Sequence, residues 1–169
     1  DVEEFHREYY LPHLSSRHGE LALFGRSLAQ LQKAVTSGFL LQVWWGERWV
    51  SGMVVERLRA ERLHPLAVGL HPSCLQSWQN GALAAAYYFL FRWAMENGVR
   101  IVDLGGSPPN RMDGLFHHKA LWAAEPKRDA WHHTEIVFYV DPAAHLPPIV
   151  AEQLVWETDR FVSLSESVR

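Results

Sequence analysis

The sequence predicts an α/β domain with a mixed, mostly antiparallel central sheet and helices on both faces. Two segments with helical spacing come first, three extended segments follow, and a long helical segment then leads into a short extended one. Antiparallel strands followed by a strand–helix–strand unit fit one sheet with a helical layer on each face. We expect a single domain over residues 1–169, and the start at Asp1 leaves open that the chain is part of a longer protein.

The first two segments are predicted helices. Residues 3–17 are rich in aromatic side chains, and we expect Pro12 to kink or end that helix. Residues 27–37 show helical spacing of apolar side chains. Ser27 is a suitable N-cap residue for this second helix, and Gly38 is a natural stop.

The next three segments are predicted strands. Residues 39–45 form a continuous apolar run, which is typical of a strand buried on both faces. A turn at 46–48 leads into a long strand over 49–59, so the pair is a predicted hairpin. Gly52 inside that strand indicates a bulge or a close backbone approach. Residues 63–70 are the third strand.

The second half contains the clearest helix, over 82–97, which Gly98 is suited to end. A short strand over 100–104 follows. Residues 113–122 are expected to start as a helix, with Asp113 before Gly114 as an N-cap or turn residue. Residues 135–140 alternate like a strand. A last helix is expected after Pro147-Pro148, with an apolar face formed by Val150, Leu154, Phe161 and Leu164.

Composition excludes several classes of function. Sixteen Lys and Arg against nineteen Asp and Glu give a net charge of −3, whereas duplex-binding proteins are usually basic, so we expect no DNA partner. The single cysteine, Cys74, permits no internal disulfide and favours the cytoplasm, with Cys74 as an inert thiol. No apolar run reaches the ~18 residues of a helix that spans a membrane.

We expect no metal, because adjacent histidines such as His132-His133 rarely chelate one ion and there is no cysteine cluster.

Two segments carry a resemblance to a known family. The first is Asp103-Leu104-Gly105-Gly106-Ser107-Pro108, and the second, over 113–122, is Asp-Gly-Leu-Phe-His-His-Lys-Ala-Leu-Trp. In this order and spacing they resemble the Fem-type branch of the GNAT-fold acyltransferases, which includes the FemAB-like peptidoglycan aminoacyltransferases and related single-domain acetyltransferases. Ala123 stands where that family usually carries glycine, and His118 replaces the usual aromatic residue before the lysine.

The resemblance implies a GNAT-like fold and N-acyl transfer. An acyl or aminoacyl group would pass from acyl-CoA, such as acetyl-CoA, or from aminoacyl-tRNA to an amine of a small or peptidyl acceptor. Trp78 and Leu83 depart from the GNAT phosphate-loop pattern, which leaves the donor open between coenzyme A and tRNA. The alternative is a non-catalytic binding or assembly module that keeps the fold.

Four residues are candidates for catalysis. The resemblance implies that Lys119 stabilises charge at the acyl centre or holds the donor. Asp103 either orients or deprotonates the amine, or caps the turn that follows it. Glu56, which we expect to face away from Trp49, Met53 and Val55, is either a base or a cross-strand partner of arginines. His117 is a further candidate base, and its neighbour His118 would point about 100° away on a helix.

Donor binding is expected at the start of the long helix. Backbone N–H groups at Asn80, Gly81 and Ala82 would hold a phosphate of the donor. The equally weighted alternative is that Asn80-Gly81 only begins the helix and binds nothing. Arg111 either is part of a basic rim that binds the phosphates of the donor, or lies on an ordinary surface exposed to solvent. The pair Trp44-Trp45, together with Trp49, is expected to pack in the core and the hairpin, with a stacking platform for an adenine or a sugar as the alternative.

Overall fold

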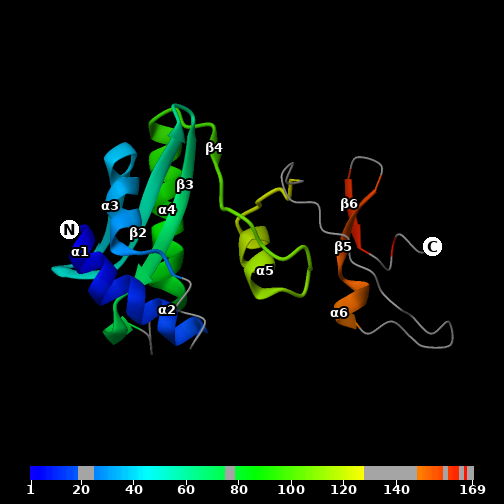
Figure 1. Cartoon of the computed structure of the whole chain (residues 1–169), viewed down its shortest axis with the longest axis horizontal. Helices are drawn as coiled ribbons and strands as arrows, with labels where there is room; N and C mark the ends of the chain where they lie inside the picture. Colours follow the sequence, from blue (N-terminus) through cyan, green and yellow to red (C-terminus); the bar gives the residue numbers. More distant parts are fainter. Residues whose placement is uncertain (19–24, 75–78, 128–147, 158–159, 164–165, 167–169) are drawn as a thin grey trace. The chain divides into compact units, whose positions relative to one another are not determined.

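The computed structural model describes residues 1–18, 25–74, 79–127, 148–157, 160–163 and 166. The chain divides into two compact units, Asp1–Gly105 and Gly106–Arg169, and each is described by itself (Figure 1). The expectation of one domain over 1–169 stays a prediction.

A four-stranded sheet in the order β1-β2-β3-β4 forms the centre of the first unit. β1 (Phe39–Trp45), β2 (Arg48–Arg59) and β3 (Arg62–Leu70) pair antiparallel, whereas β4 (Ile101–Val102) pairs parallel with β3. This arrangement confirms the mixed α/β class and the three predicted extended segments. β4 is shorter than the expected strand over 100–104.

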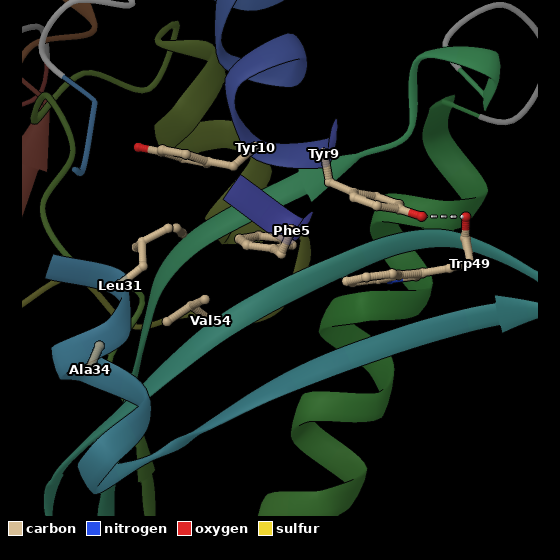
Figure 2. Packing of buried hydrophobic residues seen from close by; sticks show 8 residues of the cluster. Phe5, Tyr9, Tyr10, Leu31, Ala34, Trp49 and Val54 are labelled. Carbon is tan, nitrogen blue, oxygen red and sulfur yellow. Dashed lines mark hydrogen bonds between the residues drawn. The ribbon is translucent and has the colours of Figure 1, made fainter. Parts of the chain in front are cut away.

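Helices pack on both faces of this sheet (Figure 1). Val54 points toward one face, where it packs with side chains of the amino-terminal helix and of α3 (Leu28–Ser37) (Figure 2). Met53 and Val55 point toward the other face and pack against α4 (Gln79–Glu96). The alternation is the period-two pattern of a strand that is buried on both sides.

The amino-terminal helix consists of α1 (Val2–Glu4), a π-helical segment η1 (Phe5–Tyr10) and α2 (Leu11–His18). Of the two alternatives predicted for Pro12, a kink or an end of the helix, the end is wrong, because α2 continues beyond Pro12. The wider π turn before Pro12 relieves the clash that a proline ring makes inside an α-helix. The same winding brings Tyr9 and Tyr10 onto the face of Phe5, whose ring lies 6.4 Å and 6.3 Å from theirs.

β2 carries one extra residue opposite β1, and this changes the face on which Trp49 lies. Val43 pairs with Ser51 while Trp44 pairs with Trp49, so Val50 has no partner of its own. The expectation that Trp49 shares a face with Met53 and Val55 is therefore wrong. Trp49 packs instead with Phe5 and Tyr9, because a bulge reverses the alternation of side chains before it (Figure 2).

The ends of the helices follow the sequence signals closely. Ser27 and Gln30 form a capping box at the start of α3, and Gly38 ends that helix as predicted. Gly98 has a positive φ of 68° after α4, and the N–H of Val99 donates to the carbonyl of Ala94 at 2.9 Å. This bond is typical of a glycine-terminated helix end.

The second unit contains α5 (Gly114–Leu121), α6 (Pro148–Ala151), β5 (Leu154–Glu157) and β6 (Arg160–Ser163). The predicted last helix is wrong beyond α6, because β5 and β6 form an antiparallel hairpin. Two short runs rich in aromatic and β-branched residues flank Thr158-Asp159, and such runs favour strands over a helix. The predicted strand over 135–140, and Leu164, lie outside the described residues.

Candidate functional site

A polar cluster surrounds Asp103 where the chain leaves β4. One carboxylate oxygen of Asp103 accepts a hydrogen bond from the Arg62 guanidinium at 2.5 Å, and the other accepts from the N–H of Gly105 at 2.9 Å. Nδ1 of His64 lies 2.8 Å from the carbonyl oxygen of Asp103. Because Arg62 and His64 occupy alternate positions at the start of β3, both reach the turn that follows the neighbouring strand.

These contacts determine the charge state of Asp103. Burial alone would raise its pKa, but the N–H of Gly105 and the Arg62 guanidinium, together with His64, hold the pKa below its ordinary value. A carboxylate with a lowered pKa is a weak proton acceptor. The geometry therefore supports the turn-capping role of Asp103 more strongly than a role as general base.

Glu56 lies on β2 directly opposite His64, so the strand pairing brings two expected catalytic carboxylates, Glu56 and Asp103, to either side of one histidine. Glu56 is half-buried. Two of the three guanidinium groups expected as its partners, those of Arg57, Arg59 and Arg62, are engaged elsewhere: Arg57 donates to the carbonyl of Ala60 at 2.7 Å, and Arg62 binds Asp103. Sequence reasoning missed His64, although its alternation with Arg62 on the predicted third strand was a usable signal.

Lys119 lies in α5 and is half-buried. Its ammonium donates to the carbonyl oxygen of Gly106 at 2.6 Å. This bond joins the Gly-Gly loop to the lysine helix, which are the two segments that carry the sequence resemblance.

The start of α5 follows the predicted pattern. Asp113 is the N-cap, and its carboxylate accepts from the N–H of Phe116 at 2.9 Å, so the predicted capping role of Asp113 is confirmed. His117 is exposed one position before the half-buried His118. The two imidazoles thus occupy different faces of the helix, as their adjacency predicts.

The end of α5 explains why glycine suits the position of Ala123. Ala123 has a positive φ of 55°, and it is the single non-glycine residue with positive φ in the described part of the chain. The N–H of Ala124 donates to the carbonyl of Lys119 at 3.2 Å, and that of Ala123 donates to Ala120 at 2.9 Å. These two bonds form a Schellman motif, in which the left-handed residue is usually glycine.

The expected phosphate site lies in the first turn of α4, which begins at Gln79, three residues before the predicted start at 82. Gly81 is exposed, and a Cβ added there would meet no atom within 4 Å. Ala82 is buried, and its carbonyl accepts a hydrogen bond from Ser51 at 2.7 Å. Ala82 therefore anchors the helix on the sheet, whereas Gly81 is open to solvent; the surroundings of the Asn80 side chain lie outside the described residues.

Arg111 is paired with carboxylates of the second unit. Its guanidinium lies 3.3 Å from Glu166 and 4.0 Å from Glu152. The backbone N–H of Arg111 also donates to the carbonyl of Glu152 at 3.1 Å. Arg111 thus joins the loop before α5 to the segment after α6.

The hairpin tryptophans divide between core and surface. Trp49 is buried, whereas Trp44 and Trp45 are 54% and 68% exposed. The expected packing role in the hairpin therefore applies to the buried Trp49 and in part to Trp44, whose ring stacks on that of Trp49. Trp44 lines an open hollow that is described below.

Within the described ranges, no helix is long and apolar enough to cross a membrane. The same ranges contain no group of three or more histidine, cysteine and acidic side chains placed to hold a metal ion. The pair His132-His133 lies outside them. A comparison with models of known protein families finds no match, and a search of curated proteins finds no similar sequence.

Proposed function

We propose that the chain is an N-acyltransferase of the Fem-type GNAT class. It moves an acyl or aminoacyl group from a thioester such as acetyl-CoA, or from aminoacyl-tRNA, to an amine of a small or peptidyl acceptor. The observation that carries the proposal is the bond from the Lys119 ammonium to the carbonyl of Gly106, because it brings together the two segments on which the resemblance rests.

In the proposed reaction the acceptor nitrogen bonds to the acyl carbon while the bond to the donor thiol or ribose hydroxyl breaks. An ammonium held in place by a hydrogen bond can stabilise the developing oxyanion by about 3 kcal/mol in a dry site. His117, on the same helix as Lys119, takes the proton that the amine loses, since Asp103 is held as a weak base by Arg62 and Gly105. Gly81 leaves room for a donor phosphate at the start of α4.

A non-catalytic binding or assembly module is the second candidate. Two open hollows lie on the first unit, and none of the eight residues expected for catalysis or donor binding lines either of them. The engagement of Asp103 in turn-stabilising bonds favours the same candidate.

Donor binding separates the two candidates. The full chain is heated with acetyl-CoA, a longer acyl-CoA or aminoacyl-tRNA, and a donor at 100 times its Kd should stabilise the protein by ~2.7 kcal/mol. If no donor shifts the melting temperature, the module is favoured and the transferase proposal fails.

A variant then tests the lysine. Lys119→Ala should lower kcat with the active donor at least tenfold while the fold persists, whereas Lys127→Ala, an exposed lysine of the same unit, should leave turnover unchanged. Equal turnover in the two variants would remove Lys119 from the mechanism.

A further inference from the structure

A hollow of about 560 Å³ lies on the first unit beside the β1–β2 hairpin and the amino-terminal helix. Three aromatic residues line it, Tyr9, Trp44 and Trp49, together with two carboxylates, Glu4 and Glu47. Its volume falls in the range of small-molecule sites.

The inner part of the aromatic wall is fixed in place (Figure 2). The rings of Tyr9 and Trp49 stack at 4.1 Å, and the Tyr9 hydroxyl donates to the carbonyl of Trp49 at 3.2 Å. The indole N–H of Trp49 donates to the carbonyl of Ser51 at 2.7 Å. A ligand therefore meets rings that need no reordering, which lowers the entropic cost of binding.

Trp44 supplies the accessible aromatic surface. Its ring stacks at 6.1 Å and 20° on Trp49, yet just over half of the residue is exposed. The face of an indole carries negative electrostatic potential and attracts cations within about 6 Å. The neighbouring Trp45 is more exposed still but does not line the hollow.

The charges around the hollow also favour a cation. Glu4 and Glu47 line it, together with one arginine, Arg48, and the imidazole of His71. An adjoining hollow shares Glu4 and adds three carboxylates, while its single arginine, Arg7, is paired with Glu8 at 2.7 Å. Carboxylates gathered in a concave surface raise the local concentration of cations and repel anions such as phosphates.

We propose that this hollow binds a small organic ammonium ion, with the cation over the face of Trp44 and its charge balanced by Glu4 and Glu47. The aromatic face and the two carboxylates are both complementary to such an ion, whereas a neutral ligand would gain no charge attraction from either. The inference stands apart from acyl transfer, because none of the residues proposed for that reaction takes part.

The test uses choline and its neutral isostere 3,3-dimethylbutan-1-ol. Both are titrated into the full chain, and the indole N–H signals are followed by NMR. We expect saturable shifts with choline at an affinity at least tenfold above that of the alcohol, and weaker choline binding at high salt. Equal affinities for the two probes, or no saturable shift with choline, would overturn the proposal.

Variants locate the binding site. Trp44→Leu should weaken choline binding about tenfold, Glu47→Gln should weaken it several-fold, and Arg48→Gln should strengthen it. Trp45→Leu is the matched control and should leave the affinity unchanged. All four residues are exposed, so the fold should survive each change. Choline binding that responds to Trp45→Leu and not to Trp44→Leu would place the site elsewhere and refute the assignment.

Discussion

Gly52 and Gly69 lie directly opposite each other on β2 and β3, beneath the amino-terminal helix. A Cβ added to Gly69 would lie 2.8 Å from the backbone of Tyr9 and Tyr10, and one added to Gly52 would lie 3.2 Å from the ring of Phe5. The two glycines let the aromatic π turn rest directly on the strands. The close approach expected at Gly52 is therefore confirmed.

Gly69→Ala should destabilise the first unit by about 1–3 kcal/mol, because the neighbouring atoms are backbone and cannot rotate away. Urea unfolding measures the change. Gly81→Ala is the matched control, since its Cβ meets open space in a helix, and it should stabilise by about 0.5–1 kcal/mol. A Gly69→Ala protein as stable as the wild type would show that the helix does not lie on this strand.

Ala123→Gly should stabilise the end of α5 by about 1 kcal/mol, because it removes the steric cost of a left-handed conformation at a residue with a side chain. Amide hydrogen exchange at Ala124, whose N–H donates to Lys119, measures the effect. Ala124→Gly, at the next position where φ is not positive, should give no such gain. Lower protection in the Ala123→Gly variant would contradict the Schellman geometry.

Asp103→Asn should destabilise the first unit at neutral pH by about 1 kcal/mol, because the half-exposed ion pair with Arg62 is lost. The pKa of Asp103 is lowered in the folded state, so its stabilisation is present above the unfolded value of ~3.9. That stabilisation is lost as pH falls through the folded pKa.

Urea midpoints of the wild type and the Asp103→Asn variant should therefore converge in acid. Glu47→Gln, an exposed carboxylate, serves as the control with little change at either pH. A constant gap between wild type and Asp103→Asn from neutral to acid pH would argue against the ion pair.

Tyr9 should make the first unit sensitive to alkali. Burial, with smaller effects of Glu4, Cys74 and Glu8, raises the pKa of Tyr9 to about 12. The unfolded chain releases this proton near pH 10, so stability is full below that pH and falls as pH rises toward 12.

Tyr9→Phe should lower the free energy of unfolding by about 1 kcal/mol at neutral pH, because the hydrogen bond to the carbonyl of Trp49 is lost. Between pH 10 and 12 the stability of this variant should fall less steeply than that of the wild type. Unfolding in urea at each pH measures both effects, and Tyr88→Phe at an exposed tyrosine is the control. If the stability of Tyr9→Phe falls with pH as steeply as that of the wild type, a group other than Tyr9 causes the alkaline loss.

Local signals in the sequence predicted those parts of the fold that depend on neighbouring residues alone. The N-cap at Ser27, the glycine end at Gly98 and the N-cap at Asp113 each depend on a few adjacent positions, and all three are present. The face of Trp49 depends on a bulge that only pairing with β1 creates. Periodicity within one strand cannot report such a bulge.

In the candidate site, too, the sequence predicted only the contacts that depend on neighbouring residues. The turn at Asp103 followed from an aspartate before two glycines, and its capping bond to Gly105 is present. The approach of His64 and Glu56 to that turn depends on the register of β2, β3 and β4, which spacing along the chain does not encode. For the same reason the hollow beside Trp44 was not anticipated, since it gathers residues from three separate stretches of the chain, over 4–9, 42–49 and 71–73.

Cys74 is 3% exposed and packs beside Leu70 and Ala82, and the chain has no other cysteine. A thiol reagent added to the native protein can therefore modify one atom only, and only when the junction of β3 and α4 opens. The labelling rate therefore measures how often the packing of Cys74 against Leu70 and Ala82 opens, and a change in that rate on adding a ligand or making a substitution reports on the stability of this part of the first unit.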